Sequence, residues 1–177
     1  SRPLQTCLRG RHLRTNPPQR WTSRVEVAAA DVAPPTPAAS SNVERKGFDT
    51  VIRGLPGLLE SGLDVHYAII GIGEDEAYLR QLAIDNGVAS RVHQLGHVPM
   101  EELPRWYNAS DLFVLANREI EGDTEGFGIV FLEAAACGKA ALAGVAGGVG
   151  SAVLDGITGR CVDGADPAAV AATLREL

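Results

Sequence analysis

Short apolar segments alternate with longer segments of helical periodicity from residue 43 onward. The apolar segments, which we expect to form strands, cover residues 64–70, 91–95, 111–116, 140–143 and 160–162. The intervening segments predict helices at 48–59, 75–86, 100–109, a stretch beginning near 128, and 167–177. This alternation is typical of an α/β fold with a doubly wound parallel sheet, in which ligands bind at the carboxyl ends of the strands.

Residues 117–150 contain the densest set of candidate binding residues. Glu125 and Glu133 are eight residues apart, and Gly126 and Gly128 lie between them, ahead of an apolar run with helical spacing. The pattern predicts a loop that becomes a helix near Gly128, whose unpaired first-turn amides and dipole attract an anion such as a phosphate. A carboxylate that accepts from a sugar hydroxyl makes a charge-assisted hydrogen bond, so the pattern suits an anionic, hydroxyl-rich ligand.

This segment resembles the donor-binding half of glycosyltransferase family 4 (glycosyltransferase group 1), whose retaining enzymes have the GT-B fold. The residues that carry the resemblance are 125–133, 134–138, 140–143 and 147–148. Residues 117–118 and 122–124 are most similar to mannosyltransferases of the phosphatidylinositol mannoside type. The resemblance covers about residues 43–177 and implies a Rossmann-like, nucleotide-sugar-binding domain.

The resemblance also implies roles for individual residues. Glu125 would orient the donor sugar, Glu133 would hold the ribose, and Lys46 would neutralise the donor diphosphate. The remaining donor-binding residues would be Gly126, Phe127, Gly128, Ile129 and Val130 at the diphosphate, with Gly71, Gly73 and Val98 beside the base. Lys46 has the alternative role of a surface lysine, because relatives carry an arginine five residues earlier where this chain has Ser41.

By this resemblance the chain is an enzyme that transfers a hexosyl group, with mannose from GDP-mannose the first expectation and a UDP-sugar the second. No separate cofactor is implied. The acceptor, a lipid or saccharide, would bind an N-terminal domain outside this chain, so we expect negligible transferase activity from the chain alone. Two other interpretations remain open: a nucleotide-sugar-binding module without chemistry, and an inactive remnant of a truncated gene.

Residues 1–42 differ in composition from the rest. Six of the ten prolines and six arginines lie within residues 1–40, and we expect this segment to be disordered or non-native. The proline-rich residues 33–40 cannot form the buried strand expected just before residue 43, which suggests a truncated or frame-disrupted product. A basic tail that binds lipid headgroups or nucleic acid is the alternative.

The helix at 167–177 has no terminating cap, so the C-terminus also looks truncated.

Charge and cysteine content exclude several classes of protein. The net charge is −6, and residues 41–177 carry ten basic and twenty acidic residues, which argues against a nucleic-acid-binding surface there. Three cysteines without Cys-x-x-Cys spacing fit a cytoplasmic protein without a zinc site. No apolar run reaches the ~20 residues of a spanning helix, so we expect at most a peripheral contact of the full-length enzyme with the inner face of the membrane.

Other candidate motifs lack the required spacing. Gly71 and Gly73 are followed by Glu76, so the third glycine of a nicotinamide-binding fingerprint is missing. His93 and His97 have no metal-binding spacing and are expected to be ordinary histidines. The acidic residues from Glu119 to Glu125 include no Asp-x-Asp, and the resemblance implies metal-independent chemistry.

Overall fold

The computed structural model describes residues 24–29, 45–71, 73, 75–122 and 128–177. Within this part of the chain, six strands form one sheet in the order β3-β2-β1-β4-β5-β6, and every pair of neighbours is parallel. The strands are β1 Arg24–Ala29, β2 Val65–Ile70, β3 Val92–Gly96, β4 Leu112–Leu115, β5 Ala140–Gly144 and β6 Gly159–Val162. The strand order reverses between β1 and β4, as in a doubly wound fold.

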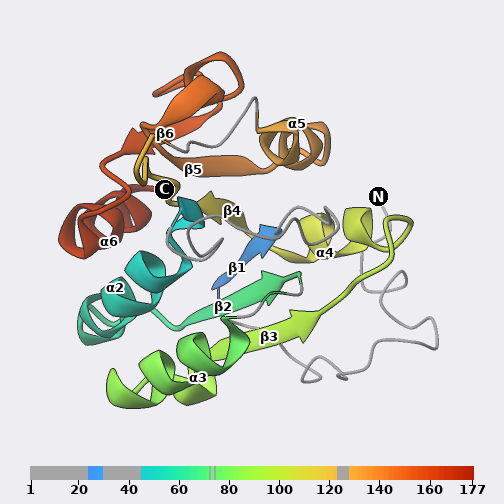
Figure 1. Ribbon diagram of the computed structural model, residues 1–177. Helices are drawn as coiled ribbons and strands as arrows, with labels where there is room; N and C mark the ends of the chain where they lie inside the picture. The colour runs from blue at the N-terminus through green and yellow to red at the C-terminus, as the bar shows by residue number, and fades with distance from the viewer. Residues whose placement is uncertain (1–23, 30–44, 72, 74, 123–127) are drawn as a thin grey trace.

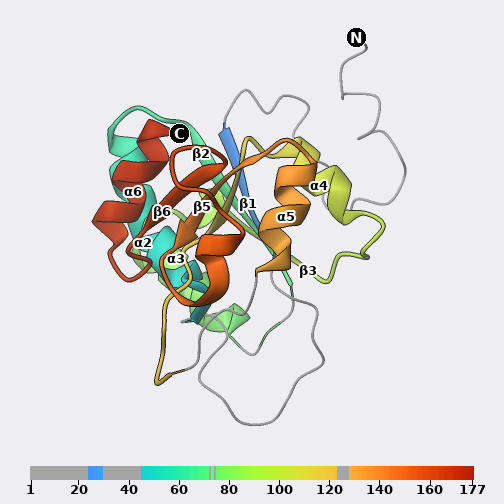
Figure 2. The ribbon, with the colours of Figure 1, turned by 90° about the horizontal axis from the view of Figure 1, so that it is seen from above.

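Helices cover both faces of this sheet, as Figures 1 and 2 show. One face carries α2 Phe48–Glu60, α3 Glu76–Asp85 and α6 Pro167–Glu176, and the other carries α4 Leu103–Ala109 and α5 Ile129–Ala136. Two short 3₁₀ turns, Ala89–Arg91 and Gly147–Ser151, lie between these elements. The predicted α/β class and doubly wound parallel sheet are therefore confirmed.

The central strand β1 corrects one sequence expectation. Residues 24–29 lie inside the segment 1–42 that was expected to be disordered or non-native, yet they pair with β2 from Arg24↔Val65 to Ala29↔Ile70 and with β4 at Glu26↔Leu112. The sequence Arg-Val-Glu-Val-Ala-Ala is long enough for a strand and has two β-branched residues, and the nearby prolines fall outside it. The rest of 1–42 lies outside the described residues.

Helix α2 shows how a residue that weakens a helix can still improve packing. Gly54 and Pro56 both lower helix propensity, but a Cβ on Gly54 would lie only 3.0 Å from the Pro167 carbonyl oxygen of α6. Glycine thus allows the two helices to pack closely. The apolar side of α2, which includes Phe48, Ile52 and Leu55, is buried against the sheet.

Two helix boundaries differ from the sequence expectation by a few residues. Helix α4 begins at Leu103 rather than Met100, with Pro104 in its first turn, where a missing amide hydrogen costs no helical hydrogen bond. Helix α3 ends at Asp85, and Gly87 follows in the left-handed conformation with φ 69°, as expected of a C-terminal cap.

No helix within the described ranges has the length and apolar character needed to cross a membrane.

Candidate donor-binding site

The carboxyl end of β4 is the point on which three other segments converge. Because all strands are parallel, their carboxyl ends lie at one edge of the sheet, and β4 flanks the reversal of strand order. A Cβ at Gly47 would lie 1.9 Å from the Ala116 oxygen, and a Cβ at Gly144 would lie 1.7 Å from the Asn117 oxygen. At Gly164, after β6, a Cβ would be 2.3 Å from the Ala116 oxygen. Glycine at these positions lets the main chains meet.

Lys46 directly precedes the turn at Gly47, and residues 45–47, called the Lys46 turn below, are held against this strand end. The Arg118 amide donates to the Arg45 carbonyl oxygen at 2.8 Å, and Gly47 adopts the left-handed conformation with φ 69° before α2 begins. Lys46 is 3% exposed. The structure therefore places Lys46, the residue predicted to neutralise the donor diphosphate, at the carboxyl edge of the sheet.

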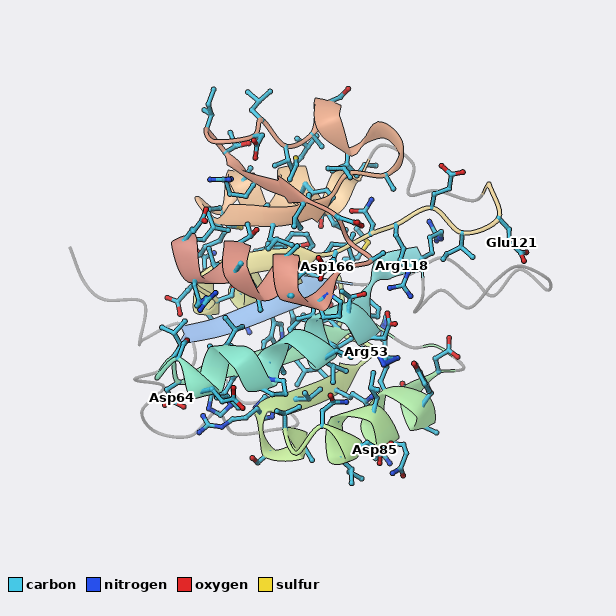
Figure 3. All side chains as sticks on the ribbon, turned by 90° about the vertical axis from the view of Figure 1, so that its left-hand side faces the viewer. Arg53, Asp64, Asp85, Arg118, Glu121 and Asp166 are labelled. Atoms are coloured by element: carbon cyan, nitrogen blue, oxygen red, sulfur yellow. The ribbon has the colours of Figure 1, made fainter. Side chains whose placement is uncertain are left out.

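Arg118 ties the same turn to α2 through its side chain. Its guanidinium donates through Nη1 to Thr50 Oγ1 at 2.5 Å and through Nη2 to Asp49 Oδ2 at 3.1 Å. Thr50 is 1% and Asp49 6% exposed, and the second Asp49 oxygen has no hydrogen-bond partner among the described residues. Figure 3 shows Arg118 beside the start of α2, with Arg53 farther along that helix. A buried carboxylate thus holds Arg118, and with it the loop after β4, beside the Lys46 turn.

Asn117 fixes the glycine loop on the other side of β4. Its side chain is fully buried, donates through Nδ2 to the Ala146 oxygen at 2.9 Å, and accepts from the Gly144 amide at 3.1 Å through Oδ1. The amide side chain satisfies one main-chain donor and one acceptor at and beyond the end of β5. The loop that contains Gly147 and Gly148 is therefore anchored to the end of β4.

Helix α5 begins at Ile129, directly after Gly128, near which the sequence predicts the start of a helix. Gly128 has φ 72° and ψ 52°, and a Cβ there would lie 2.7 Å from Phe131 Cδ2, so glycine is required on both backbone and steric grounds. Among the described residues, no side chain caps the start of α5. Ile129 is 65% exposed, and Val130 is half-buried. Because α5 follows β4, this uncapped start lies at the carboxyl edge. The predicted residues Glu125, Gly126 and Phe127 lie outside the described residues.

Glu133 lies within α5 and is held from the neighbouring helix. The Tyr107 hydroxyl of α4 donates to Glu133 Oε2 at 2.8 Å, and Tyr107 is only 2% exposed. Glu133 is half-buried rather than a fully solvated helix residue. Its contact with a ribose stays a prediction.

The residues predicted to lie beside the base occupy the ends of β2 and β3. The Gly71 amide donates to the Gly96 oxygen at 2.9 Å, and Gly71 has φ 134°, a conformation that favours glycine. Gly73 is exposed. The Val98 side chain is 6% exposed and packs with Ala68 and Ile70 in a small core cluster. All three positions are at the carboxyl edge, and the side chain of Val98 has a packing role there.

His93 pairs with His66 on the neighbouring strand, away from the carboxyl edge. His66 Nδ1 and His93 Nε2 are 2.9 Å apart, and the rings stack with centroids separated by 5.2 Å. The pKa of His93 is lowered by burial and then by the charges of His66 and Arg91, and the pKa of His66 is lowered by burial and by Arg91, partly offset by Asp64. The pair is best explained as part of the structure of the sheet.

Potential metal ligands lie apart from one another in the part of the chain that the structure describes. Across the described ranges, no three His, Cys, Asp or Glu side chains gather in a way that could hold a metal ion. His97 is exposed, and the acidic run from Glu119 to Glu125 lies partly outside these ranges.

Comparison with known proteins accounts for this arrangement. Residues 32–177 match the protein-family profile described as "Glycosyl transferases group 1". The chain belongs to this family. The match begins slightly before residue 43, where the sequence resemblance was expected to start.

Two relatives from the glycosyl transferases group 1 family illustrate the likeness in sequence. The chain is 42% identical over 137 residues to a GDP-mannose-dependent alpha-(1-6)-phosphatidylinositol monomannoside mannosyltransferase of Mycolicibacterium smegmatis, covering 76% of this chain and 36% of that protein. It is 36% identical over 141 residues to D-inositol 3-phosphate glycosyltransferase 1 of Catenulispora acidiphila, covering 75% of this chain and 32% of that protein. The chain thus spans about a third of the length of these curated relatives.

Solved structures share the fold. Anabaena Alr3699/HepE in complex with UDP-glucose has a TM-score of 0.70 at 24% identity, covering 88% of this chain and 39% of that chain. The C-terminal domain of the group 1 family protein LpcC from Francisella tularensis has a TM-score of 0.67 at 23% identity, covering 88% of this chain and 74% of that chain. Both structures share the fold of this chain.

Three contributors to the site were not recognised as such from the sequence. Tyr107 was not singled out, and Asn117 and Arg118 were noted only as part of the resemblance. Each of them bonds to a residue that is 26 or more positions away in the chain. Tyr107 bonds to Glu133, Asn117 to Ala146, and Arg118 to Asp49. An Asn-Arg pair directly after a buried strand is a usable signal, because polar residues at the carboxyl end of a parallel strand face the ligand edge.

Proposed function

We propose that this chain is the donor-binding part of a retaining hexosyltransferase and binds a nucleoside diphosphate sugar at the carboxyl edge of its sheet. GDP-mannose is the donor we favour, and a UDP-sugar is the second choice. The observation that carries the proposal is the close approach of the main chain at Gly47, Gly144 and Gly164 to the end of β4, next to Lys46, with the start of α5 at the same carboxyl edge of the sheet.

The comparisons support this proposal through what the related proteins are called. The mycobacterial relative is named as GDP-mannose-dependent, which favours a guanine nucleotide and mannose. A structural neighbour is described in complex with UDP-glucose, which supports a nucleotide sugar as the ligand class. Another neighbour is described as a C-terminal domain, which supports a donor-binding domain for this chain.

The chemistry we propose depends on charge stabilisation at the leaving group. Departure of the sugar leaves additional negative charge on the diphosphate, which the Lys46 ammonium and the amides that open α5 would stabilise. Glu125 would orient the donor sugar, and Glu133 would accept from the ribose. The acceptor would attack from the face from which the diphosphate leaves, so the anomeric configuration is retained.

Measuring nucleotide binding by the purified, unsubstituted chain tests the proposal directly. We would follow thermal unfolding of the purified chain with GDP, GDP-mannose, UDP and UDP-glucose. A ligand at 100 times its dissociation constant adds about 2.7 kcal/mol to the free energy of unfolding. For a domain of this size that is a rise of about 5–10 °C in Tm. We expect the largest rise with GDP-mannose.

The two lysines of the chain provide a matched pair of variants. Lys46→Met should weaken GDP binding by about tenfold or more, because a charge-assisted contact with the diphosphate is lost. Lys139→Met should leave binding unchanged, since Lys139 follows the far end of α5 and donates to the Asn108 oxygen at 3.1 Å. A folded chain that is stabilised by none of the four nucleotides would refute the proposed function.

A further inference from the structure

A hydrogen bond between α4 and α5 holds the Glu133 carboxylate. The Tyr107 hydroxyl donates to Oε2 at 2.8 Å, and no other described residue is hydrogen-bonded to that carboxylate. A phenol that donates to a carboxylate makes a charge-assisted hydrogen bond, which is stronger than a neutral one and restricts the rotamers of the glutamate. Within the described residues one oxygen is therefore occupied, and Oε1 is the oxygen that we expect to accept from a ligand.

Tyr107 is itself held firmly enough to serve this purpose. Its ring is buried and packs edge-on against Phe113 at 5.7 Å, and Phe113 packs edge-on against Phe131 of α5 at 5.4 Å. The Ser110 hydroxyl donates to the Tyr107 carbonyl oxygen at 2.8 Å at the end of α4. The hydroxyl of Tyr107 has little freedom to leave Glu133.

A second hydrogen bond joins the same two segments. Lys139, three residues beyond the end of α5, donates to the Asn108 oxygen of α4 at 3.1 Å. The two helices are therefore connected both at Glu133 and beyond the end of α5. The position of Glu133 relative to α4 is set by contacts that exist without a ligand.

We propose that Tyr107 is a positioning residue that orients Glu133 toward the ribose hydroxyls, so that the site discriminates ribose from deoxyribose nucleotides. This inference rests on the proposed function, because it needs a nucleotide at the site. A carboxylate preorganised with one free oxygen loses less rotamer entropy when it accepts from a hydroxyl than one that is free to rotate. Removal of the phenol oxygen should therefore weaken recognition of the sugar hydroxyls and leave diphosphate binding intact.

The test compares the affinity for GDP with that for 2′,3′-dideoxy-GDP by calorimetry, and uses the uridine pair if the wild-type chain prefers UDP. We expect the wild type to prefer the ribonucleotide by about tenfold or more, as the loss of a charge-assisted hydrogen bond implies. Tyr107→Phe keeps the ring and its packing, and should reduce this preference severalfold. Glu133→Gln should reduce it at least as much.

Tyr67→Phe is the matched control. Tyr67 is also fully buried, but it lies on the other face of the sheet. Ala68 and Ile70 of β2 pack toward α4, and successive side chains of a strand point to opposite faces, so Tyr67 points away from α4. Its loss of a hydroxyl should leave the ribose preference unchanged. Because the readout is a ratio of two affinities, a general loss of stability in any variant does not produce the expected result.

The outcomes separate the two proposals. A wild type that binds no nucleotide overturns the proposed function and this inference together. A wild type that prefers ribose, with the preference intact in Tyr107→Phe, overturns the inference and leaves the proposed function standing. A wild type that binds nucleotide without any ribose preference also overturns the inference.

A measurement on the unsubstituted sequence covers the case in which Tyr107→Phe does not fold. The chain has three tyrosines, so 3-fluorotyrosine labelling yields three ¹⁹F signals. The Tyr107 signal, assigned with Tyr67→Phe and Tyr78→Phe samples, should respond differently to GDP and to 2′,3′-dideoxy-GDP. An identical response to the two nucleotides would overturn the inference.

Discussion

The buried ion pair between Arg118 and Asp49 predicts a large loss of stability when the arginine is removed. The side chains of Asp49 and Arg118 are 8% and 17% exposed, and their nearest atoms are 3.1 Å apart. In Arg118→Met the apolar stem is kept, but the carboxylate stays buried. Only Arg53 remains as a described ion-pair partner, at 3.9 Å and with its side chain 41% exposed.

Stranding one partner of a buried pair costs about 3–5 kcal/mol, because the remaining charge has lost both water and its counter-ion. The weaker Arg53 contact places the expected cost near the lower end, at about 3 kcal/mol. Against a total stability of about 5–15 kcal/mol this is a large fraction. It corresponds to a fall in Tm of about 6–12 °C for a domain of this size.

Urea denaturation followed by far-UV circular dichroism measures the change, with Arg53→Met as the control. Arg53 contacts the same carboxylate from an exposed position, so its loss should cost no more than about 1 kcal/mol. The double variant Asp49→Asn with Arg118→Met should recover part of the lost stability, because no charge is then stranded. The reasoning fails if Arg118→Met costs no more than Arg53→Met, or if the double variant is less stable than Arg118→Met alone.

Two further predictions concern stability. Gly144→Ala should destabilise the domain by about 3 kcal/mol or more, because its Cβ would lie 1.7 Å from the main-chain oxygen of Asn117, which cannot move aside. Gly57→Ala in α2, where a Cβ meets nothing within 4 Å, should stabilise by about 0.5–1 kcal/mol, and equal Tm values for the two variants would contradict this. Burial lowers the pKa of His66 and of His93 below the ordinary 6.5, so the unfolded chain binds more protons below pH 6.5 and stability should fall as the pH drops from 6.5 toward the folded-state pKa values. His93→Gln should reduce that slope in urea titrations at a series of pH values, and an unchanged slope would exclude the pair as its source.

The local sequence was sufficient to predict most elements of the fold. The start of α5 after Gly128 and the strand of residues 140–143 were predicted within one residue, because each depends on spacing and glycine chemistry within a few positions. The expectation failed at β1, where six residues lie between proline-rich segments. A short strand of this kind has a weak local signal and is stabilised by pairing with β2 and β4, which are distant in the chain.

In the candidate site, too, some features could be predicted from the local sequence and others depend on tertiary packing. The positions of Lys46 and Gly128 at the carboxyl edge and of Glu133 within α5 could be predicted, because they follow from a motif and from the parallel topology. The hydrogen bond from Tyr107 to Glu133 could not. It depends on the distance between two helices, which is set by how their side chains pack against the sheet.

By itself, the sequence determined the order and type of the elements after residue 43 and the family to which the chain belongs, because periodicity and the 117–150 motif are properties of neighbouring residues. Only the tertiary structure decided which distant groups meet: Arg118 with Asp49, Asn117 with the loop after β5, and β1 with the centre of the sheet. The physical reason is that burial makes these contacts necessary. A buried polar group or strand edge must find a partner, and the packed fold determines which partner lies within reach.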